Sequence, residues 1–234
     1  MGSQQLGERE RELLRVVGVM VDEGLEFVVV GGHAVSALGR HRFSTDCDVV
    51  VRKAEVENFD RILRAEGFVS GKGRNQLDET YGGEFVRYSK SVHGYPISVD
   101  LLVNSLVCRN TDAAWSYEYI REHSQWATIP GSSTAVECRT ADRELTVAFK
   151  IHAGRKTDVR DVVVLAQEAD VRAIASHLRR GDLEELRRQI DRMLGALDDE
   201  RLLDSLKGVF RLEGEVKGQI RRAKSLISSL RDYL

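Results

Sequence analysis

Apolar residues in the first third of the chain follow two different patterns. In residues 8–23 and 54–65 they recur three and four positions apart with charged residues between them, which predicts two amphipathic helices. Residues 27–30 and 46–51 instead contain short valine-rich runs, which are too short for helices and predict buried strands. Helices that alternate with strands in this way indicate a mixed α/β arrangement.

The middle of the chain predicts the remainder of a sheet. The strand-like segments are residues 85–88, 95–103, 126–129 and 134–138. The first two flank a Ser-Val-His-Gly-Tyr turn and are expected to form a hairpin, and the last two flank a Pro-Gly-Ser-Ser turn. A short helix over residues 111–122, capped by Thr111, is predicted between the two pairs. The polar, glycine-rich residues 71–83 are predicted to form a loop or hairpin tip.

The composition changes after Arg139, where the remaining chain becomes helical in its pattern. A helix capped within residues 140–144 is predicted first, apolar residues at helical spacing continue to the end, and no proline follows Pro130. We therefore expect two domains, a catalytic domain over residues 1–139 and a helical domain over residues 140–234. The predicted fold class is α+β, with a mixed α/β sheet flanked by helices and a C-terminal helical bundle.

Composition narrows the class of protein. The 234 residues are 42% apolar and 31% charged, and no apolar run approaches the roughly 20 residues that span a membrane. The N-terminus has no apolar signal region, so a cytoplasmic location without a membrane partner is expected. Three cysteines without metal-binding spacing indicate neither a disulfide framework nor a zinc site. With a formal net charge of −2, binding to nucleic acid would require a local basic patch.

Two glycines and two aspartates carry the candidate chemistry. Gly31 and Gly32 lie between the first predicted strand and a short helix, so their backbone N–H groups can hold phosphate at a helix N-terminus. Asp46 and Asp48 alternate on the next strand and therefore share one face. Two carboxylates this close repel each other, and a hard ion such as Mg²⁺ relieves the repulsion. The combination is typical of phosphoryl or nucleotidyl transfer; a turn with two solvated aspartates is the alternative.

These residues occur in a recognisable order. The glycine pair, thirteen intervening residues and Asp46-x-Asp48 resemble the signature of the polymerase-β-like nucleotidyltransferase superfamily. The string Arg42-x-Ser44-x-Asp46-x-Asp48 more narrowly resembles the AbiEii/MenT-type nucleotidyltransferase toxins, which are relatives of the antibiotic nucleotidyltransferases. The resemblance implies a polymerase-β-like mixed sheet and an enzyme that moves NMP from an NTP to an acceptor hydroxyl and releases pyrophosphate. The implied cofactor is Mg²⁺, or Mn²⁺ in its place.

By the same resemblance the acceptor is a tRNA 3′ end and the protein is the toxin of a toxin–antitoxin pair, with a cognate antitoxin as a further partner. A transferase that modifies a small hydroxylated antibiotic is the alternative enzyme. A degenerate fold kept only for binding is the non-enzymatic alternative. It is disfavoured because the glycines and the clustered charges are all present.

Asp100 interrupts an otherwise apolar predicted strand, where a buried carboxylate requires a partner. In the family that the chain resembles, a third carboxylate on a later strand completes the metal site and takes the proton from the acceptor hydroxyl. The resemblance assigns this role to Asp100, and an exposed position at a strand edge is the alternative. The implied metal ligands are Asp46, Asp48 and Asp100. The implied nucleotide-binding residues of this part of the chain are Gly31, Gly32, Arg42 and Ser44.

Lys150 lies between apolar neighbours on the first helix of the C-terminal part. The toxin family carries a lysine there that contacts nucleotide phosphates, followed by an Arg-x-x-Asp-x-x-Asp string, which this chain matches with Arg155, Asp158 and Asp161. The resemblance therefore implies that Lys150 is both catalytic and nucleotide-binding. Because Asp158 and Asp161 share a helix face, they can orient Lys150 or pair with nearby arginines. A lysine whose ammonium reaches solvent is the alternative.

The end of the chain is locally basic. Residues 207–234 carry seven basic and three acidic side chains. Four of the basic residues recur at spacings that place them on one helical face, and we call them the basic stripe: Lys217, Arg221, Lys224 and Arg231. A solvated face is the simpler interpretation, and contact with an RNA backbone is the alternative.

Overall fold

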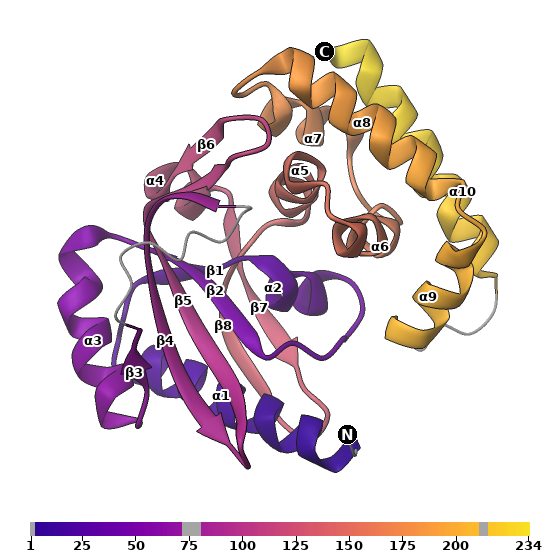
Figure 1. The fold of residues 1–234 in the computed structure, drawn as a ribbon. Coiled ribbons are helices and arrows are strands. Elements are labelled where there is room, and N and C mark those ends of the chain that lie inside the picture. The colour runs from indigo at the N-terminus through magenta and orange to yellow at the C-terminus, as the bar shows by residue number, and fades with distance from the viewer. Residues whose placement is uncertain (1–2, 72–80, 211–214) are drawn as a thin grey trace. The chain divides into compact units, whose positions relative to one another are not determined.

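The computed structural model describes residues 3–71, 81–210 and 215–234 (Figure 1), so most of the loop predicted at residues 71–83 lies outside it. The chain forms two compact units. Unit 1 comprises residues 1–37, 41–106 and 115–141, and unit 2 comprises residues 38–40, 107–114 and 142–234. The predicted domain boundary between residues 139 and 140 stays a prediction. No helix within the described ranges is long and apolar enough to cross a membrane.

Unit 1 is built on a mixed sheet (Figure 1). The strands are β1 (Phe27–Val29), β2 (Asp46–Val51), β3 (Val69–Ser70), β4 (Tyr81–Val92), β5 (Tyr95–Cys108), β6 (Ala113–Ser116), β7 (Ser124–Pro130) and β8 (Ala135–Ala141). Their order is β3-β4-β5-β2-β1-β8-β7, and β6 pairs with β5. β1 is antiparallel to β2 and parallel to β8, while β2 is parallel to β5. The predicted α+β fold with a mixed sheet flanked by helices is confirmed.

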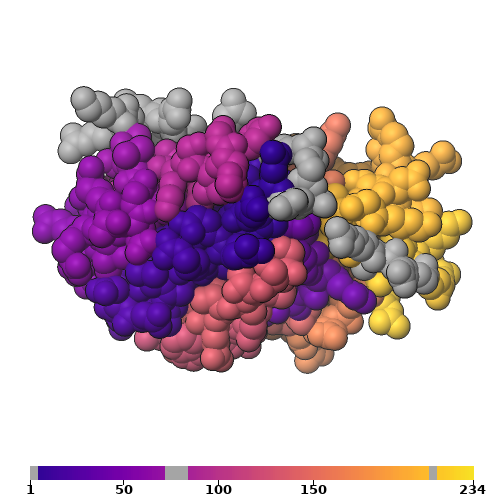
Figure 2. Space-filling model, turned by 90° about the horizontal axis from the view of Figure 1, so that it is seen from below, coloured from indigo at the N-terminus to yellow at the C-terminus, as the bar shows by residue number. Residues whose placement is uncertain are grey.

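Helices cover both faces of this sheet. They are α1 (Ser3–Asp22), α2 (Gly31–Leu38), α3 (Val56–Ala65), preceded by the 3-10 turn η1 (Lys53–Glu55), and α4 (Tyr117–Glu122). Leu13 of α1 and Phe59 of α3 share one hydrophobic core with Val49 of β2 and Leu101 of β5, and Figure 2 shows α1 in indigo beside the salmon-coloured β7 and β8. Because alternate strand residues point to opposite faces, the even-numbered residues of β2, both aspartates included, face away from this core.

The helix predicted over residues 111–122 is wrong in its first half. The segment Ala113–Ser116 forms β6, which buries every second side chain, a tryptophan among them, so the period of two that suits a strand prevails there. α4 begins after it and is capped by the Ser116 hydroxyl, which accepts a hydrogen bond from a backbone N–H of the first turn. The predicted cap, Thr111, is instead hydrogen-bonded through its hydroxyl to Nδ1 of His152, at 2.7 Å, within unit 2.

The predicted start of the C-terminal helices also shifts. Thr140 belongs to β8, where it pairs with Val29 of β1, and therefore does not cap a helix. The cap is Asp142, whose carboxylate accepts a hydrogen bond from the backbone N–H of Leu145 at 2.8 Å. The strands of the hairpin, β4 and β5, are both longer than predicted.

Unit 2 is a bundle of helices. They are α5 (Arg143–Ala153), α6 (Lys156–Leu165), α7 (Val171–Leu178), α8 (Leu183–Leu197), α9 (Arg201–Phe210) and α10 (Val216–Ser229), followed by the 3-10 turn η2 (Leu230–Tyr233). α5 contacts α6, α7 and α8, and its side chains from Leu145 to Ala153 are all buried. The centre of the bundle therefore includes polar residues of α5, which need partners inside the protein.

Two buried histidines are expected to make the fold sensitive to mild acid. Burial lowers the pKa of His33 in unit 1 and of His152 in unit 2 to about 4. Below about pH 6.5 the unfolded chain binds a proton at each histidine, whereas the folded protein does not until about pH 4. Stability should therefore fall as the pH drops through this window, by up to about 3 kcal/mol for each histidine.

Urea unfolding between pH 7.5 and 5 would measure this effect. Carboxylates with lowered pKa values, such as Glu12 at about 2, lose their contribution at lower pH, because an unfolded carboxylate takes up its proton only below about pH 4.5. The slope above pH 5 thus belongs mainly to the histidines. A free energy of unfolding that stays constant over this range would contradict the assignment.

Candidate active site

The register between two parallel strands brings the predicted carboxylates together. β2 pairs with β5 so that Asp48 lies directly opposite Asp100, and Asp46 lies opposite Ser98. Directly opposed residues of neighbouring strands point to the same face of the sheet. The three aspartates therefore share one face, the one that points away from the core under α1 and α3.

The glycine pair fits closely against these residues. Gly31, whose φ is 66°, is the first residue of α2, and a Cβ added to it would lie 2.2 Å from Oδ2 of Asp48. A Cβ on Gly32 would lie 2.8 Å from Nη2 of Arg42 and 3.2 Å from Oγ of Ser44. A side chain at Gly31 would be strained by the positive φ and would clash with Asp48, whereas one at Gly32 would have to displace the end of the Arg42 side chain. The start of α2 thus lies directly against three of the predicted site residues.

The loop that carries Arg42 and Ser44 is held at several points. The Ser36 hydroxyl of α2 bonds both the backbone oxygen and the backbone N–H of Arg42 at 3.3 Å. Nε2 of His41 lies 2.6 Å from Oε1 of the buried Glu10 of α1. The Ser44 hydroxyl lies 3.1 Å from the backbone oxygen and 3.3 Å from Oδ1 of Asp46. The loop is thus fixed to two helices before it enters β2.

Asp100 already has a partner, which sequence reasoning missed. Arg87 of β4 donates two hydrogen bonds to its carboxylate, from Nε to Oδ1 at 2.9 Å and from Nη2 to Oδ2 at 2.7 Å. Asp100 is 2% exposed. Burial raises its pKa above the ordinary value, although the ion pair with Arg87 opposes the shift. Both carboxylate oxygens are therefore directed at a cation of the protein itself.

The sequence contained a signal for this pair. β4 ends at Val92 and β5 begins at Tyr95, so the hairpin turn consists of two residues, both with positive φ. Such turns fix the register of a hairpin. The sixth residue outward from the turn is Arg87 on one strand and Asp100 on the other. Knowing that the turn has two residues would therefore have been enough to pair Arg87 with Asp100.

The donor set suits a hard divalent cation. Three carboxylates on one face supply the oxygen ligands that Mg²⁺ and Mn²⁺ prefer, and Asp46 is exposed at the start of β2. The N–H groups of Gly31 and Gly32 at the N-terminus of α2 provide a neighbouring place for phosphate oxygens. The structure thus brings together Asp46, Asp48, Asp100, Gly31, Gly32, Arg42 and Ser44 in unit 1.

The other predicted cluster lies in unit 2. Nζ of Lys150, which is 4% exposed, lies 2.9 Å from Oδ1 of Asp158 and 2.8 Å from Oδ2 of Asp161. Asp158 also accepts hydrogen bonds from the backbone N–H and from Nε of Arg155, at 3.0 and 2.9 Å. Burial alone would lower the pKa of Lys150, but the two aspartates raise it. The ammonium is therefore charged and held by both carboxylates, while Arg160 bonds Ser205.

Ion pairs occupy most of the basic stripe. Arg221 pairs with Glu215 at 2.8 Å, Lys224 pairs with Asp198 at 2.6 Å, and Arg231 pairs with Asp191. Each of these acids neutralises a positive charge that would otherwise be available to an RNA phosphate. The geometry favours the interpretation of the stripe as a solvated, ion-paired face.

Comparison with known proteins adds a family match. The family model of the nucleotidyl transferase AbiEii toxin of type IV toxin–antitoxin systems matches residues 13–224. No curated protein sequence matches the chain.

Solved structures share the fold. The crystal structure of JHP933 from Helicobacter pylori is 16% identical, with a TM-score of 0.51 over 99% of this chain and 94% of that one. That of a candidate nucleotidyltransferase from H. pylori is also 16% identical, with a TM-score of 0.52 over 99% and 96%. A lincosamide antibiotic adenylyltransferase, LnuA, is 15% identical, with a TM-score of 0.46 over 68% and 98%. At these identities the first two show the fold alone.

The ion pair between Arg87 and Asp100 leads to a prediction about metal binding. Arg87→Gln should lower the free energy of unfolding in EDTA by about 1–2 kcal/mol, because the buried carboxylate loses its cation. It should also enlarge the rise in Tm that Mg²⁺ produces, because the ion no longer competes with a guanidinium for the same oxygens. Thermal unfolding with and without Mg²⁺ measures both effects.

Arg87→Lys is the matched control. It keeps the charge and loses the two parallel hydrogen bonds, so both effects should be intermediate. If Mg²⁺ raises the Tm of the wild type and of Arg87→Gln equally, Arg87 and the ion do not share Asp100.

Proposed function

The chain belongs to the AbiEii nucleotidyltransferase toxin family of type IV toxin–antitoxin systems, and on that premise we propose that it is a Mg²⁺-dependent enzyme that transfers NMP from an NTP to the 3′ end of a tRNA. Mn²⁺ can replace Mg²⁺ in this proposal because it prefers the same oxygen ligands. A cognate antitoxin is proposed as its partner and the cytoplasm as its location.

One observation carries this proposal. The parallel register of β2 and β5 sets three aspartates on one face, beside a helix start whose first residue must be glycine. Carboxylates next to backbone N–H groups that can hold phosphate form the combination that metal-assisted phosphoryl transfer needs. When bound, the metal ion neutralises charge on the triphosphate and on the leaving pyrophosphate.

Residues of unit 1 have distinct proposed roles. Asp46, Asp48 and Asp100 hold the metal, and the N–H groups of Gly31 and Gly32 bind phosphate oxygens. Arg42 and the Ser44 hydroxyl, both adjacent to the glycine turn, contact the triphosphate.

The chemical step follows from this arrangement. The acceptor hydroxyl oxygen attacks the α-phosphorus, the bond from that phosphorus to the bridging oxygen of the β-phosphate breaks, and pyrophosphate leaves. Asp100 takes the proton of the hydroxyl in this proposal.

Lys150 is proposed to contact the nucleotide phosphates, with Asp158, Asp161 and Arg155 holding its ammonium in place. The ion pairs determine how this role can be tested. Removing Lys150 leaves two fully buried carboxylates without their cation, which destabilises the unit by several kcal/mol. Loss of activity in Lys150→Ala would therefore not distinguish catalysis from folding. Lys150→Arg, which keeps the charge, is the informative variant.

The central test is transfer itself. We expect the purified protein, incubated with each labelled NTP, Mg²⁺ and total RNA, to label tRNA and release pyrophosphate. Asp46→Asn and Asp48→Asn should each lower the rate at least about a hundredfold, because they remove metal ligands. Without Mg²⁺ the Tm of Asp46→Asn should stay level or rise, since this substitution relieves repulsion between like charges.

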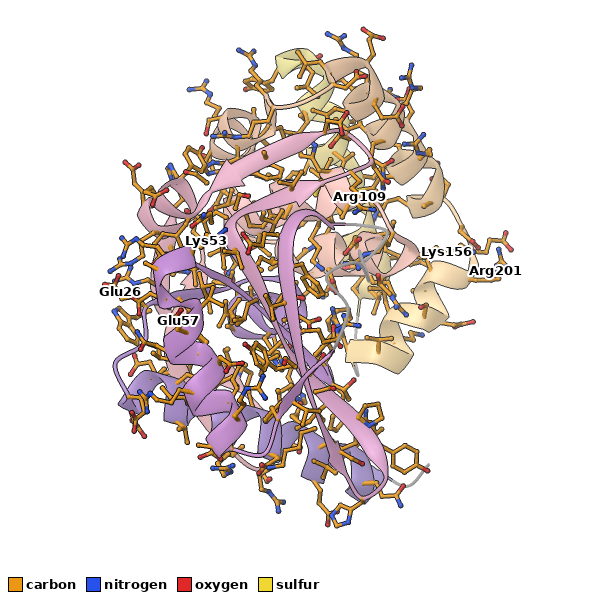
Figure 3. All side chains as sticks on the ribbon, turned by 60° about the vertical axis from the view of Figure 1, so that its left-hand side comes forward. Glu26, Lys53, Glu57, Arg109, Lys156 and Arg201 are labelled. Atoms are coloured by element: carbon orange, nitrogen blue, oxygen red, sulfur yellow. The ribbon has the colours of Figure 1, made fainter. Side chains whose placement is uncertain are left out.

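Glu57→Gln is the matched control, because Glu57 is an exposed carboxylate on α3 of unit 1 (Figure 3). It should leave transfer and stability unchanged. Undiminished transfer by both aspartate variants would refute the metal assignment. Labelling of a small hydroxylated antibiotic, with no label in RNA, would refute the tRNA acceptor and support the alternative acceptor.

A further inference from the structure

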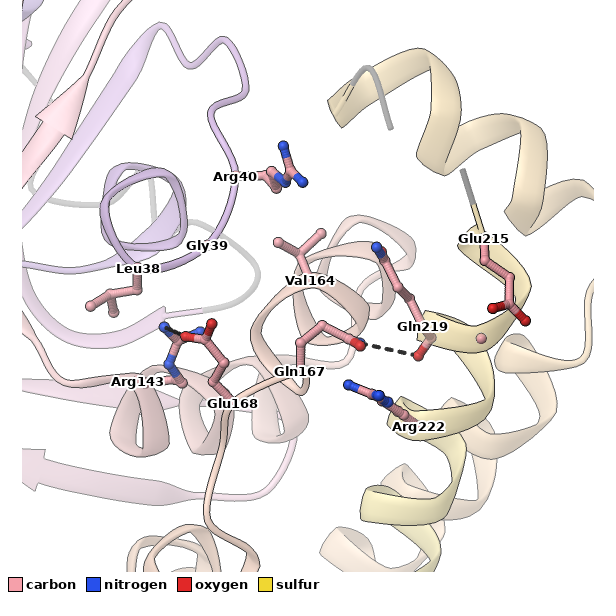
Figure 4. Close-up of a pocket in the computed structure, with 11 residues that line it drawn as sticks. Leu38, Gly39, Arg40, Arg143, Val164, Gln167, Glu168, Glu215, Gln219 and Arg222 are labelled. Carbon is pink, nitrogen blue, oxygen red and sulfur yellow. Dashed lines mark hydrogen bonds and ion pairs between the residues drawn. The ribbon is translucent and has the colours of Figure 1, made fainter. Parts of the chain in front are cut away.

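Unit 2 contains a polar pocket that none of the proposed catalytic residues lines. Its volume is about 430 Å³ (Figure 4). The chain after α2, the start of α5, the end of α6 and the first turns of α10 form its walls. The side chains that matter to its chemistry are Arg40, Arg143, Gln167, Glu168, Glu215, Gln219 and Arg222.

The two acidic residues of the lining are already neutralised. Glu168 accepts a hydrogen bond from Nη2 of Arg143 at 2.8 Å. Glu215 accepts one at 2.8 Å from Arg221, which is not part of the lining. Arg40 and Arg222 have no acidic partner among the residues that the structure describes. The pocket therefore presents two uncompensated positive charges.

Neutral hydrogen-bond donors complete the lining. Nε2 of Gln167, which follows α6, donates to the backbone oxygens of Val163 and Gln219, at 2.7 and 3.2 Å, and so links the end of α6 to α10. In Figure 4 the Gln219 side chain extends from α10 on the side of Arg40, and Arg222 extends toward Gln167. An amide and two guanidinium groups thus border one hollow.

We propose that this pocket binds a phosphate group, either of a free polyphosphate or of an RNA backbone. Guanidinium groups donate in a planar fork that matches phosphate oxygens. Two positive charges without an internal counterion suit a ligand with two negative charges or two successive phosphodiesters. The volume exceeds that of a single phosphate, so a larger molecule that carries the group fits.

This assignment differs from that of the basic stripe. The stripe residues Arg221, Lys224 and Arg231 have acidic partners, whereas Arg222, next to Arg221 in the sequence, lines the pocket without one in the described part of the chain. Binding at this pocket needs no metal and no transfer step, so it can be measured separately from the proposed catalysis.

The test is a binding titration of the double variant Arg40→Gln/Arg222→Gln in EDTA. Calorimetry with inorganic pyrophosphate and, separately, with a single-stranded RNA oligonucleotide shows which source supplies the phosphate. Affinity for at least one of the two should fall at least tenfold. For RNA, the slope of log affinity against log salt should also decrease in magnitude by about 1.4, the value for two phosphate contacts on a single strand.

The matched control is Lys156→Gln/Arg172→Gln, which removes two positive charges from exposed positions of unit 2 outside the pocket; Figure 3 labels Lys156. It should leave both affinities unchanged. Because Arg40 and Arg222 are exposed, the pocket variant should keep the wild-type Tm, which confirms that it is folded.

Three patterns of results decide the proposal. If the pocket variant binds pyrophosphate more weakly but binds RNA normally, the ligand is a free polyphosphate. If it binds RNA more weakly but binds pyrophosphate normally, the pocket contacts an RNA backbone. If the two double variants lose affinity equally, or if neither does, the pocket is not a phosphate site. Because the titration is done in EDTA and without an NTP, its outcome is separate from any failure of the proposed transfer chemistry.

Discussion

The pairing of β2 with β5 is the constraint on which the candidate site depends. Its parallel register places Asp48 beside Asp100, and a shift by one residue would turn either carboxylate into the opposite, apolar face. Clustered carboxylates repel one another unless cations lie nearby. Arg87 supplies one to Asp100, and the contact of Gly31 with Asp48 leaves no room for a side chain there. The strands, the helix start and the hairpin thus all adapt to one group of negative charges.

The buried carboxylates of unit 2 also need cations nearby, and there the protein supplies them itself. Lys150, Asp158, Asp161 and Arg155 place two positive charges against two negative ones in a mostly buried cluster. This set is compensated internally, so it holds α5 to α6 without any ligand. In unit 1, by contrast, three carboxylates share one face of the sheet, and Arg87 donates two parallel hydrogen bonds to Asp100. Like charges gathered on one face are the physical reason to expect a metal cation at the aspartates of unit 1, whereas the aspartates of α6 hold Lys150.

Two surfaces of unit 2, the basic stripe and the polar pocket, differ in whether their positive charges have acidic partners. The basic stripe looks cationic in sequence, but three of its four residues pair with acids of the same unit. The polar pocket has the opposite character, because its acids are paired and two of its arginines lack acidic partners among the described residues. Basic sequence composition is therefore a poor guide to anion binding, since surface ion pairs depend on neighbours far along the chain.

The sequence by itself determined the local elements and the chemistry of the strand–helix–strand segment, because valine runs, glycines and alternating aspartates act within a few residues. It identified β1, α2 and β2, the mixed fold, the family and the candidate carboxylates. Only the tertiary structure decided the partners. Arg87 reaches Asp100 through a hairpin, and Trp115 is buried in a strand where a helix was predicted. Lys150 of α5 meets both aspartates of α6, which the sequence left open as one of two arrangements. Each depends on strand register or packing between distant segments, which local patterns do not encode.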